Sequence, residues 1–348
     1  MRANALFHVA ERRVECREVA LAAPDTGQVL IKSRCSAISS GTEAMIFSGA
    51  FPQDTTLDAS IESLKRGFAY PFSYGYALVG EVSATGPGVD QALIGKTLFA
   101  FHPHQDWAVV PLDACLRIPD HVPAEAALFL PQVETALNLV MDGAPLIGER
   151  VLVFGQGVVG MLTAALLAEF PLARLVAVEP LAWRRELARH WGMAETVDPA
   201  DAGEWQALLA SLNGADLVFE LSGDMAALNQ GIEAAGFDGR IVVGSWYGAK
   251  SQPLDLGGRF HRNRLRLISS QVSTLKPALT GRWDKARRIE LAWRMVEKLQ
   301  PQRLISQSFP LAQCGQAFES VCARRDGVMQ VIFNYQEAVS ELPKRPLT

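Results

Sequence analysis

The sequence predicts an α/β protein with a β-rich N-terminal domain followed by a doubly wound parallel sheet. Two observations lead to this prediction. In the first 125 or so residues, short apolar runs are separated by Gly, Pro and Asp, which is typical of strands and turns. From about residue 125 onward, apolar strand-like runs alternate with stretches of helix length, which indicates a parallel sheet covered by helices. A length of 348 residues is also enough for two domains.

Apolar runs mark the expected strands of the N-terminal domain. We expect strands at residues 28–33, 78–82, 97–101 and 107–110. The stretch 50–72 contains no comparable run and is predicted to form a long loop with one short helix at most. Loops of this length inside a compact domain are usually functional, so we expect this one to influence the choice of substrate.

Strand-like and helix-like stretches alternate from residue 151. The expected strands are 151–154, 175–178, a short one near Thr196, 216–220, 241–244 and 265–269, and the expected helices are 158–169, 182–191, 204–212 and 225–235. Further along, we expect an amphipathic helix at 286–299, a helix near 311–323, a strand at 328–333 and a poorly ordered tail at 336–348. The predicted segments of the chain are therefore 1–125, 126–276 and 277–348.

The most specific motif of the chain lies in residues 151–179. A β-branched apolar run is followed by Gly155, Gly157 and Gly160 in the spacing G-x-G-x-x-G, and then by a stretch of helix length. A second apolar run ends on Glu179, 24 residues after Gly155. A glycine triplet alone would fit an ordinary turn. Strand, glycine turn, helix, strand and acid in this order predict a dinucleotide-binding site.

Each glycine of this motif has a distinct physical role in binding a dinucleotide. Gly155 permits the tight turn, Gly157 lets the backbone approach the pyrophosphate, and Gly160 lets the helix pack against the strand. The N-terminus of the helix offers free N–H groups and a positive dipole end to the phosphates. The other expected cofactor contacts are Gln156, Val158 and Val159 in the turn, and Ser222, Gly223, Gly244, Ser245 and Trp246 at the ends of later strands.

The acid at the end of the second strand favours NAD over NADP. The carboxylate of Glu179 can accept hydrogen bonds from the adenosine ribose hydroxyls and repels a 2′-phosphate. Arg184 and Arg185 lie one turn into the next expected helix and could offset that repulsion, which keeps NADP as the alternative. Otherwise we expect these two arginines on a solvated helix face.

The composition excludes several functional classes. Net charge is −4, so the chain gives no reason to expect nucleic acid or a membrane surface as a partner. The N-terminal residues lack the features of a signal peptide, and a cytoplasmic location is expected. The five cysteines are scattered and contain no C-x-x-C pair, which argues against a disulfide framework or a zinc knuckle.

A β-rich N-terminal domain, a central dinucleotide-binding unit and a short C-terminal return resemble the medium-chain dehydrogenase/reductase superfamily. The resemblance covers residues 1 to about 335. It implies a GroES-like catalytic domain, a Rossmann domain and a final segment that returns to the catalytic domain. It also implies a homodimer and a small-molecule substrate.

The zinc enzymes of that superfamily hold a catalytic zinc with residues of two motifs, C-G-[TS]-D and G-H-E. Here the first motif aligns as Ser40-Gly41-Thr42-Glu43 and the second as Gly75-Tyr76-Ala77, so serine and tyrosine replace two ligands. A third ligand position falls at about Pro131, and residues 85–120 lack the four cysteines of a structural zinc lobe. Because zinc needs Cys, His or carboxylate donors, we predict that no metal is bound.

Two histidines, His102 and His104, are candidates to replace the missing ligands. Asp106 follows them, but the group lacks further supporting ligands, so we expect a surface position or a place beside the substrate for one of these histidines. The S-x-G-T-E form of the first motif resembles a zinc-free branch that includes the 3-hydroxyethyl bacteriochlorophyllide a dehydrogenases. That likeness is local, and we do not transfer the pigment substrate.

Without zinc, four residues of the two motifs are candidates for the chemistry. The resemblance implies that Thr42 relays the proton of the substrate alcohol, although it could instead cap a helix that begins at Glu43. Tyr76 could donate a hydrogen bond to a carbonyl oxygen or simply fill space. Glu43 could accept a proton or pair with an arginine, and Ser40 occupies the vacated ligand position.

Two further sets of charged residues are weaker candidates. Glu134 is a possible acid. A basic cluster between residues 259 and 294 is expected mainly on solvated faces or at a subunit contact, and its stretch 261–266 is the part expected nearest to the substrate. Arg288 belongs to this cluster.

Taken together, the sequence predicts a zinc-independent oxidoreductase that transfers a hydride between NAD(H) and a carbonyl or alcohol substrate. Two alternatives stay open. One is a reductase of conjugated double bonds, as in quinone or enoyl reductases. The other is a nucleotide-binding scaffold that has lost catalysis.

Overall fold

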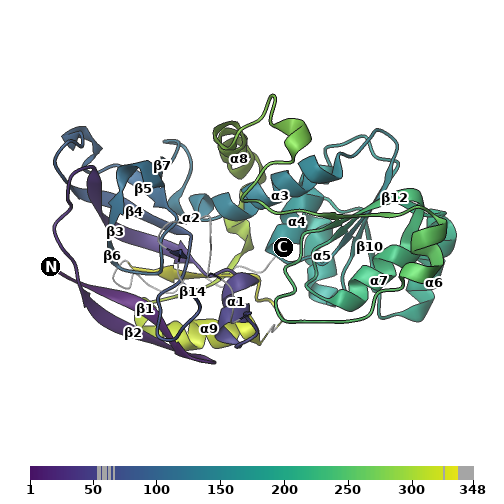
Figure 1. The fold of residues 1–348 in the computed structure, drawn as a ribbon, viewed down its shortest axis with the longest axis horizontal. Helices are drawn as coiled ribbons and strands as arrows, with labels where there is room; N and C mark the ends of the chain where they lie inside the picture. Colours follow the sequence, from purple (N-terminus) through teal and green to yellow (C-terminus); the bar gives the residue numbers. More distant parts are fainter. Residues whose placement is uncertain (53–55, 57–60, 62–63, 66, 324–325, 336–348) are drawn as a thin grey trace. The chain divides into compact units, whose positions relative to one another are not determined.

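The computed structural model describes residues 1–52, 56, 61, 64–65, 67–323 and 326–335. The chain divides into two compact units (Figure 1). Unit 1 contains Met1–Pro131 and the segment that begins at Trp293, and unit 2 contains Gln132–Ala292. We had expected boundaries after residues 125 and 276. The prediction for the tail 336–348 falls outside the described residues, and so does the part of the predicted loop 50–72 at residues 53–55, 57–60, 62–63 and 66.

Unit 2 is built on a parallel sheet of six strands in the order β10-β9-β8-β11-β12-β13 (Figure 1). The strands are β8 (Arg150–Phe154), β9 (Arg174–Val178), β10 (Glu195–Val197), β11 (Ala215–Glu220), β12 (Ala235–Val243) and β13 (Arg266–Ser269). All six lie where the apolar runs predicted them. The first strand sits in the middle and the chain winds outward in both directions from it, which confirms the predicted doubly wound sheet.

Helices cover this sheet between successive strands. They are α4 (Val158–Leu167), α5 (Ala182–His190), α6 (Ala202–Leu212) and α7 (Met225–Ala234), and all four were predicted. One face of the sheet is closed by α6 and α7, whose Trp205, Leu208 and Leu228 pack on Phe154 and Val176 in one buried cluster. This apolar packing is the main stabilising term of the unit, since each fully buried side chain of this size contributes about 1.5–3 kcal/mol.

Unit 1 is a β-rich unit around a seven-stranded sheet. Its strands follow the order β14-β15-β3-β4-β5-β7, and β6 also pairs with β3. The bounds are β3 (Gln28–Ala37), β4 (Leu78–Thr85), β5 (Thr97–Ala100), β6 (Trp107–Pro111), β7 (Cys115–Arg117), β14 (Ile305–Phe309) and β15 (Gln330–Asn334). The strands β3 to β6 and β15 were predicted, whereas β7 and β14 were not.

A hairpin of β1 (Arg2–Ala10) and β2 (Arg13–Ala20) forms a separate two-stranded sheet that the sequence did not reveal. Its turn contains Glu11 and Arg12, and Arg12 adopts a positive φ of 55° without a glycine. Hairpin turns are normally recognised by Asn-Gly or Asp-Gly pairs, so this turn carried no signal.

The remaining helices are α1 (Thr42–Phe47), α2 (Ala124–Ala127), α3 (Leu130–Gly143), α8 (Lys285–Leu299) and α9 (Cys314–Cys322). The sequence predicted α8 and α9 but not α3, whose polar residues interrupt its apolar pattern. In unit 1, α9 packs with Phe318 on Leu6 and Phe47 in a buried cluster. Among the described residues, no helix combines the length and apolarity that a membrane span requires.

Candidate functional site

The glycine turn after β8 has the tight geometry that the motif predicts. Gly155 has φ +85°, and a Cβ atom there would lie 2.6 Å from the Cα atom of Ser222. A Cβ atom on Gly160 would lie 1.8 Å from the carbonyl oxygen of Gly155. The first glycine thus allows β8 to turn beside the end of β11, and the third allows α4 to approach the turn. Both positions exclude a larger residue.

Gly157 differs from the other two glycines because the space around it is open. It is the N-cap of α4 in an extended conformation, with φ −73° and ψ −175°. A Cβ atom there would meet nothing closer than Nη1 of Arg184, at 4.0 Å. The N-terminus of a ten-residue helix therefore faces room that a ligand could enter.

Glu179 lies directly after β9, and its side chain is only 3% exposed. One carboxylate oxygen accepts a hydrogen bond from the backbone N–H of Gln156 at 2.7 Å, and the other accepts from the N–H of Leu181 at 3.1 Å. The carboxylate thus ties the glycine turn to the end of the neighbouring strand. Each oxygen has a second lone pair with which it can accept a further hydrogen bond.

The two arginines of α5 have separate roles. Arg185 donates to the carbonyl oxygens of Glu179 and Pro180, both at 2.7 Å, and pairs with Asp198 at 3.0 Å. Arg185 therefore stabilises the local backbone. The guanidinium of Arg184 lies over the ring of Trp183, 5.1 Å from its centroid, and is the group nearest to the open side of Gly157. Of the two, only Arg184 lies at the glycine turn.

The carboxyl ends of β11 and β12 form a hydrogen-bonded group around Glu220, which is 1% exposed. Its carboxylate accepts from Ser222 Oγ and from the hydroxyl of Tyr247, both at 2.5 Å. Burial and the neighbouring Glu220 raise the pKa of Tyr247 above its usual value. Neither Glu220 nor Tyr247 was predicted, since their contact depends on the pairing of distant segments.

The small residues predicted at these strand ends lie beside that group. Ser245 Oγ accepts a hydrogen bond from the N–H of Gly223 at 2.9 Å. A Cβ atom on Gly244 would approach side-chain atoms of Leu139 and Leu221 to 2.5 Å, so this glycine serves close packing. Trp246 is 47% exposed, which leaves its indole ring accessible to a ligand.

In unit 1, Glu43 forms an enclosed pair with His104. Both side chains are fully buried, and His104 Nε2 lies 2.8 Å from Glu43 Oε2. The other oxygen of Glu43 accepts from the N–H of Ser39 at 2.8 Å. The expected alternative that Glu43 pairs with an arginine is wrong. His104 does not lie on the surface, which was one of the two positions expected for a histidine of this pair. Its side chain is buried, and its hydrogen-bond partners are Ser36 in β3 and Glu43 in α1.

Thr42 and Ser40 remain accessible beside this pair. Thr42 is partly exposed as the first residue of α1, and Ser40 is exposed just before it. The N-cap of the helix is Gly41, so the expectation that Thr42 caps the helix is wrong. Since the side chain of Thr42 does not serve as the cap, its hydroxyl is compatible with a contact to substrate.

Tyr76 lies at the edge of an aromatic cluster. It is partly buried, and its ring meets that of Tyr74 edge-on, with the centroids 6.3 Å apart. The same cluster contains Ile46, Phe51 and Phe72 as buried members. The ring packs against apolar neighbours, which both predicted roles of Tyr76 allow.

The residues at the two motifs do not fit a zinc ion. Ser40 and Tyr76 are weak donors compared with Cys and His, and Glu43 already pairs with His104. Nδ1 of His102 lies 3.0 Å from the carbonyl oxygen of Pro103, and burial lowers the pKa of its ring. Within the part of the chain that the structure describes, no group of three or more His, Cys, Asp or Glu residues could hold a metal. None of the five cysteines, all of which the structure describes, forms a disulfide.

The weaker candidates have structural partners in unit 2. Arg288 is fully buried and donates to one carboxylate oxygen of Glu134 at 2.8 and 3.0 Å. The expectation of a solvated face is therefore wrong for Arg288, and Glu134 is a partner of a buried cation. In the stretch 261–266, Arg266 forms an exposed pair with Asp238.

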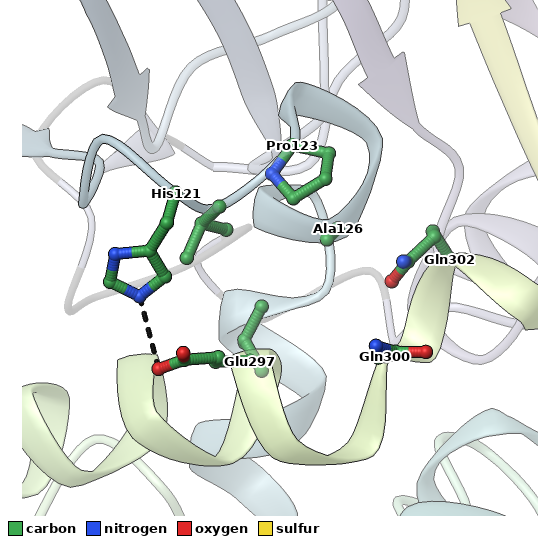
Figure 2. Close-up of a pocket in the computed structure, with 8 residues that line it drawn as sticks. His121, Pro123, Ala126, Glu297, Gln300 and Gln302 are labelled. Atoms are coloured by element: carbon green, nitrogen blue, oxygen red, sulfur yellow. Dashed lines mark ion pairs between the residues drawn. The ribbon is translucent and has the colours of Figure 1, made fainter.

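A pocket of about 270 Å³ in unit 1 lies away from these candidates (Figure 2). It is formed by α2 and the last turns of α8, where His121 pairs with Glu297 at 3.0 Å. Its lining contains none of the predicted catalytic residues. We therefore do not assign the candidate chemistry to this pocket.

Comparison with known proteins shows what these features are similar to. Residues 158–288 match the family model described as zinc-binding dehydrogenase. The chain is 23% identical over 283 residues to D-guloside 3-dehydrogenase of Escherichia coli K12, which covers 77% of this chain and 81% of that protein. It is 26% identical over 268 residues to L-threonine 3-dehydrogenase of Pyrococcus horikoshii, covering 68% and 73%.

Solved structures show the same fold over nearly the whole chain. An alcohol dehydrogenase from E. coli CFT073, complexed with NADH, matches with a TM-score of 0.77 at 17% identity, over 96% of this chain and 99% of that one. A structure from Sinorhizobium meliloti 1021, bound to NADP, matches with a TM-score of 0.76 at 18% identity and the same coverage. These neighbours confirm the predicted combination of a GroES-like unit and a Rossmann unit. The chain is thus similar to the zinc-binding dehydrogenases over residues 158–288, and its fold is that of the dehydrogenase structures it matches.

Proposed function

We propose that this protein is a zinc-independent oxidoreductase that uses a nicotinamide cofactor to interconvert an alcohol and a carbonyl compound. The observation that carries the proposal is the open space at Gly157, at the N-terminus of α4, between two glycines whose packing excludes any side chain. Such a helix end binds a pyrophosphate through its free N–H groups. The bound cofactor would accept or donate the hydride.

The preferred cofactor in this proposal is NAD. Glu179 keeps a lone pair on each oxygen for the ribose hydroxyls, and its charge disfavours a 2′-phosphate. Arg184 is the neighbouring cation that would reduce this preference. Fluorescence titration with NADH and NADPH measures the preference directly. We expect tighter binding of NADH, and a smaller difference between the two cofactors in Glu179→Gln.

The residues of unit 1 supply the proton chemistry in this proposal. The hydroxyl of Thr42 would accept a hydrogen bond from the substrate alcohol and pass its proton on, and the phenol of Tyr76 would donate to the carbonyl oxygen. Ser40 would lie beside the substrate, next to Thr42. Glu43 is enclosed, so it acts through its neighbours rather than on the substrate. Independence from zinc follows from the donor set and fits the zinc-free branch that the S-G-T-E motif resembles.

The named relatives suggest which substrates to test first. They act on a guloside and on threonine, both of which carry hydroxyl groups on a small polar molecule. We propose a substrate of this kind, in a homodimeric and cytoplasmic enzyme, and light scattering would determine the oligomeric state. The predicted role of the segment 50–72 in substrate choice also remains a proposal.

The test is a screen of sugar, polyol and hydroxy-acid substrates with NAD, followed by Thr42→Val. We expect turnover that falls by about 10²-fold or more in Thr42→Val, the usual scale of a lost proton-transfer group, at unchanged NADH affinity. Reduction of enones or quinones alone would favour the double-bond reductase. Cofactor binding without any turnover would favour the scaffold.

A further inference from the structure

One imidazole ring contacts both motifs that carry the candidate chemistry. Nε2 of His104 lies 2.8 Å from the carboxylate of Glu43, next to Thr42. The same ring packs on Gly75, next to Tyr76, because a Cβ atom on Gly75 would lie 3.0 Å from Nε2 and Cδ2 of His104. The backbone N–H of His104 also donates to the carbonyl oxygen of Tyr74. His104 therefore holds the segments 39–43 and 74–76 against one another.

Both ring nitrogens of His104 have a hydrogen-bond partner. Nδ1 of His104 lies 2.7 Å from Ser36 Oγ, which lies 2.8 Å from the hydroxyl of Tyr335. With a neutral ring, Tyr335 donates to Ser36, Ser36 donates to Nδ1, and Nε2–H donates to Glu43. Every buried polar atom in this chain of groups then has a partner, so the ring has one favoured orientation.

A second buried histidine in unit 1 shows that burial alone does not create such an arrangement. His8 is also fully buried, and it lies between the rings of Phe72 and Phe318. Neither of its ring nitrogens has a hydrogen-bond partner within the described residues. His8 thus serves only packing, whereas His104 is fixed by polar contacts on both sides.

We infer that the His104–Glu43 pair is the device that positions Thr42 and Tyr76, in the place where zinc enzymes of the superfamily join the same two motifs through a metal. The inference rests on the proposed function for what these two residues do, but the tether itself is a property of unit 1. A tether of this kind is a positioning group, since neither buried side chain can reach a substrate. It also explains why serine and tyrosine are tolerated at two ligand positions: the segments no longer depend on a metal to stay together.

The variants are chosen so that no buried charge is left unpaired. His104→Phe alone would leave the carboxylate of Glu43 uncompensated, which is strongly destabilising and would obscure the result. The double variant Glu43→Gln/His104→Phe removes the tether and the charge together. Glu43→Gln alone keeps one oxygen acceptor, for either His104 or the N–H of Ser39, and is the intermediate variant. The control is His8→Phe, which removes a buried imidazole without removing a hydrogen bond.

Two measurements test the inference. Hydrogen–deuterium exchange by mass spectrometry reports how firmly the segments 39–47 and 74–77 are held. In the double variant we expect faster exchange in both segments together and unchanged exchange in unit 2. We further expect kcat to fall by about tenfold or more while the Kd for NADH changes by less than about twofold. Glu43→Gln should give protection and kcat between those of wild type and double variant, because it keeps one of the two hydrogen bonds accepted by Glu43, and His8→Phe should leave kcat and the segment 39–43 unchanged.

Three outcomes would contradict the inference that the His104–Glu43 pair holds the two segments together. They are unchanged exchange in both segments of the double variant, uniform loss of protection across unit 1, and an equal loss of kcat in His8→Phe. Failure of the proposed function is a different result. In that case the wild-type protein turns over no substrate, and the exchange measurement still decides whether His104 holds the two segments.

Discussion

The carbonyl oxygen of Gly155 lies 1.8 Å from the place where a Cβ atom of Gly160 would be. The contact is between backbone atoms, so no side chain can rotate to relieve a substitution. It sets how closely α4 approaches the end of β8, and it therefore sets the position of the N–H groups that would bind a pyrophosphate.

We expect Gly160→Ala to lower the free energy of unfolding by about 1–3 kcal/mol, the usual cost of overpacking, and to weaken NADH binding. Chemical denaturation and fluorescence titration measure the two effects. Gly257→Ala is the control, because a Cβ atom there has nothing within 4 Å, and we expect its stability to stay within about 0.5 kcal/mol of wild type. Equal effects of the two substitutions would contradict the packing argument.

Arg288 and Glu134 form a buried ion pair in unit 2 that we expect to be sensitive to substitution. Arg288→Met would leave the carboxylate of Glu134 without its partner, which should cost about 3–5 kcal/mol of unfolding free energy. The double variant Arg288→Met/Glu134→Gln should recover a large part of the loss. Arg266→Met breaks an exposed pair and should cost about 1 kcal/mol or less. A similar loss of unfolding free energy in Arg288→Met and Arg266→Met would contradict the claim that burial makes the Arg288–Glu134 pair sensitive to substitution.

His8 predicts a specific dependence of stability on pH. Burial, and to a smaller extent the neighbouring His104, lowers the pKa of His8 from 6.5 to about 3. Between these two pH values, His8 is protonated in the unfolded chain but not in the folded chain. The contribution of His8 to the free energy of unfolding is therefore constant above about pH 6.5 and falls as the pH decreases. At about 1.4 kcal/mol for each pKa unit, the loss approaches ~5 kcal/mol near pH 3.

The variant His8→Phe isolates this contribution. Between pH 7.5 and pH 4, the unfolding free energy of the wild type should fall relative to that of the variant as the pH decreases, because only the wild type binds a proton at position 8 on unfolding. Parallel curves would mean that His8 does not titrate in this range.

The donor set at the two motifs predicts how the protein responds to metal removal. Ser40 and Tyr76 do not supply the ligands of a zinc site, so elemental analysis should find far less than one zinc ion per chain. Turnover should survive dialysis against a chelator, and added zinc should not increase it. Stoichiometric zinc that leaves together with activity would refute zinc independence.

Local signals in the sequence predicted most strands and helices of unit 2, while long-range contacts in both units were missed. The glycine turn and the strands around it could be predicted because glycine spacing and apolar runs act within about thirty residues. The hairpin of β1 and β2 was missed because Glu11 and Arg12 form its turn without glycine. His104 and Glu43 are 61 residues apart, and Arg288 and Glu134 are 154 apart, so their pairing depends on the fold and left no pattern in the sequence.

The most direct test of the central claim is a fluorescence titration of Gly157→Val with NADH, beside the wild type. The backbone of Gly157 is extended and its surroundings are open, so valine should fit without steric strain, at a cost of about 1 kcal/mol for the poorer N-cap. The same side chain would occupy the space that a pyrophosphate needs. We predict saturable NADH binding by the wild type and none by a stably folded variant. Equal binding by the two proteins, or no binding by the wild type, would contradict the assignment of a dinucleotide site.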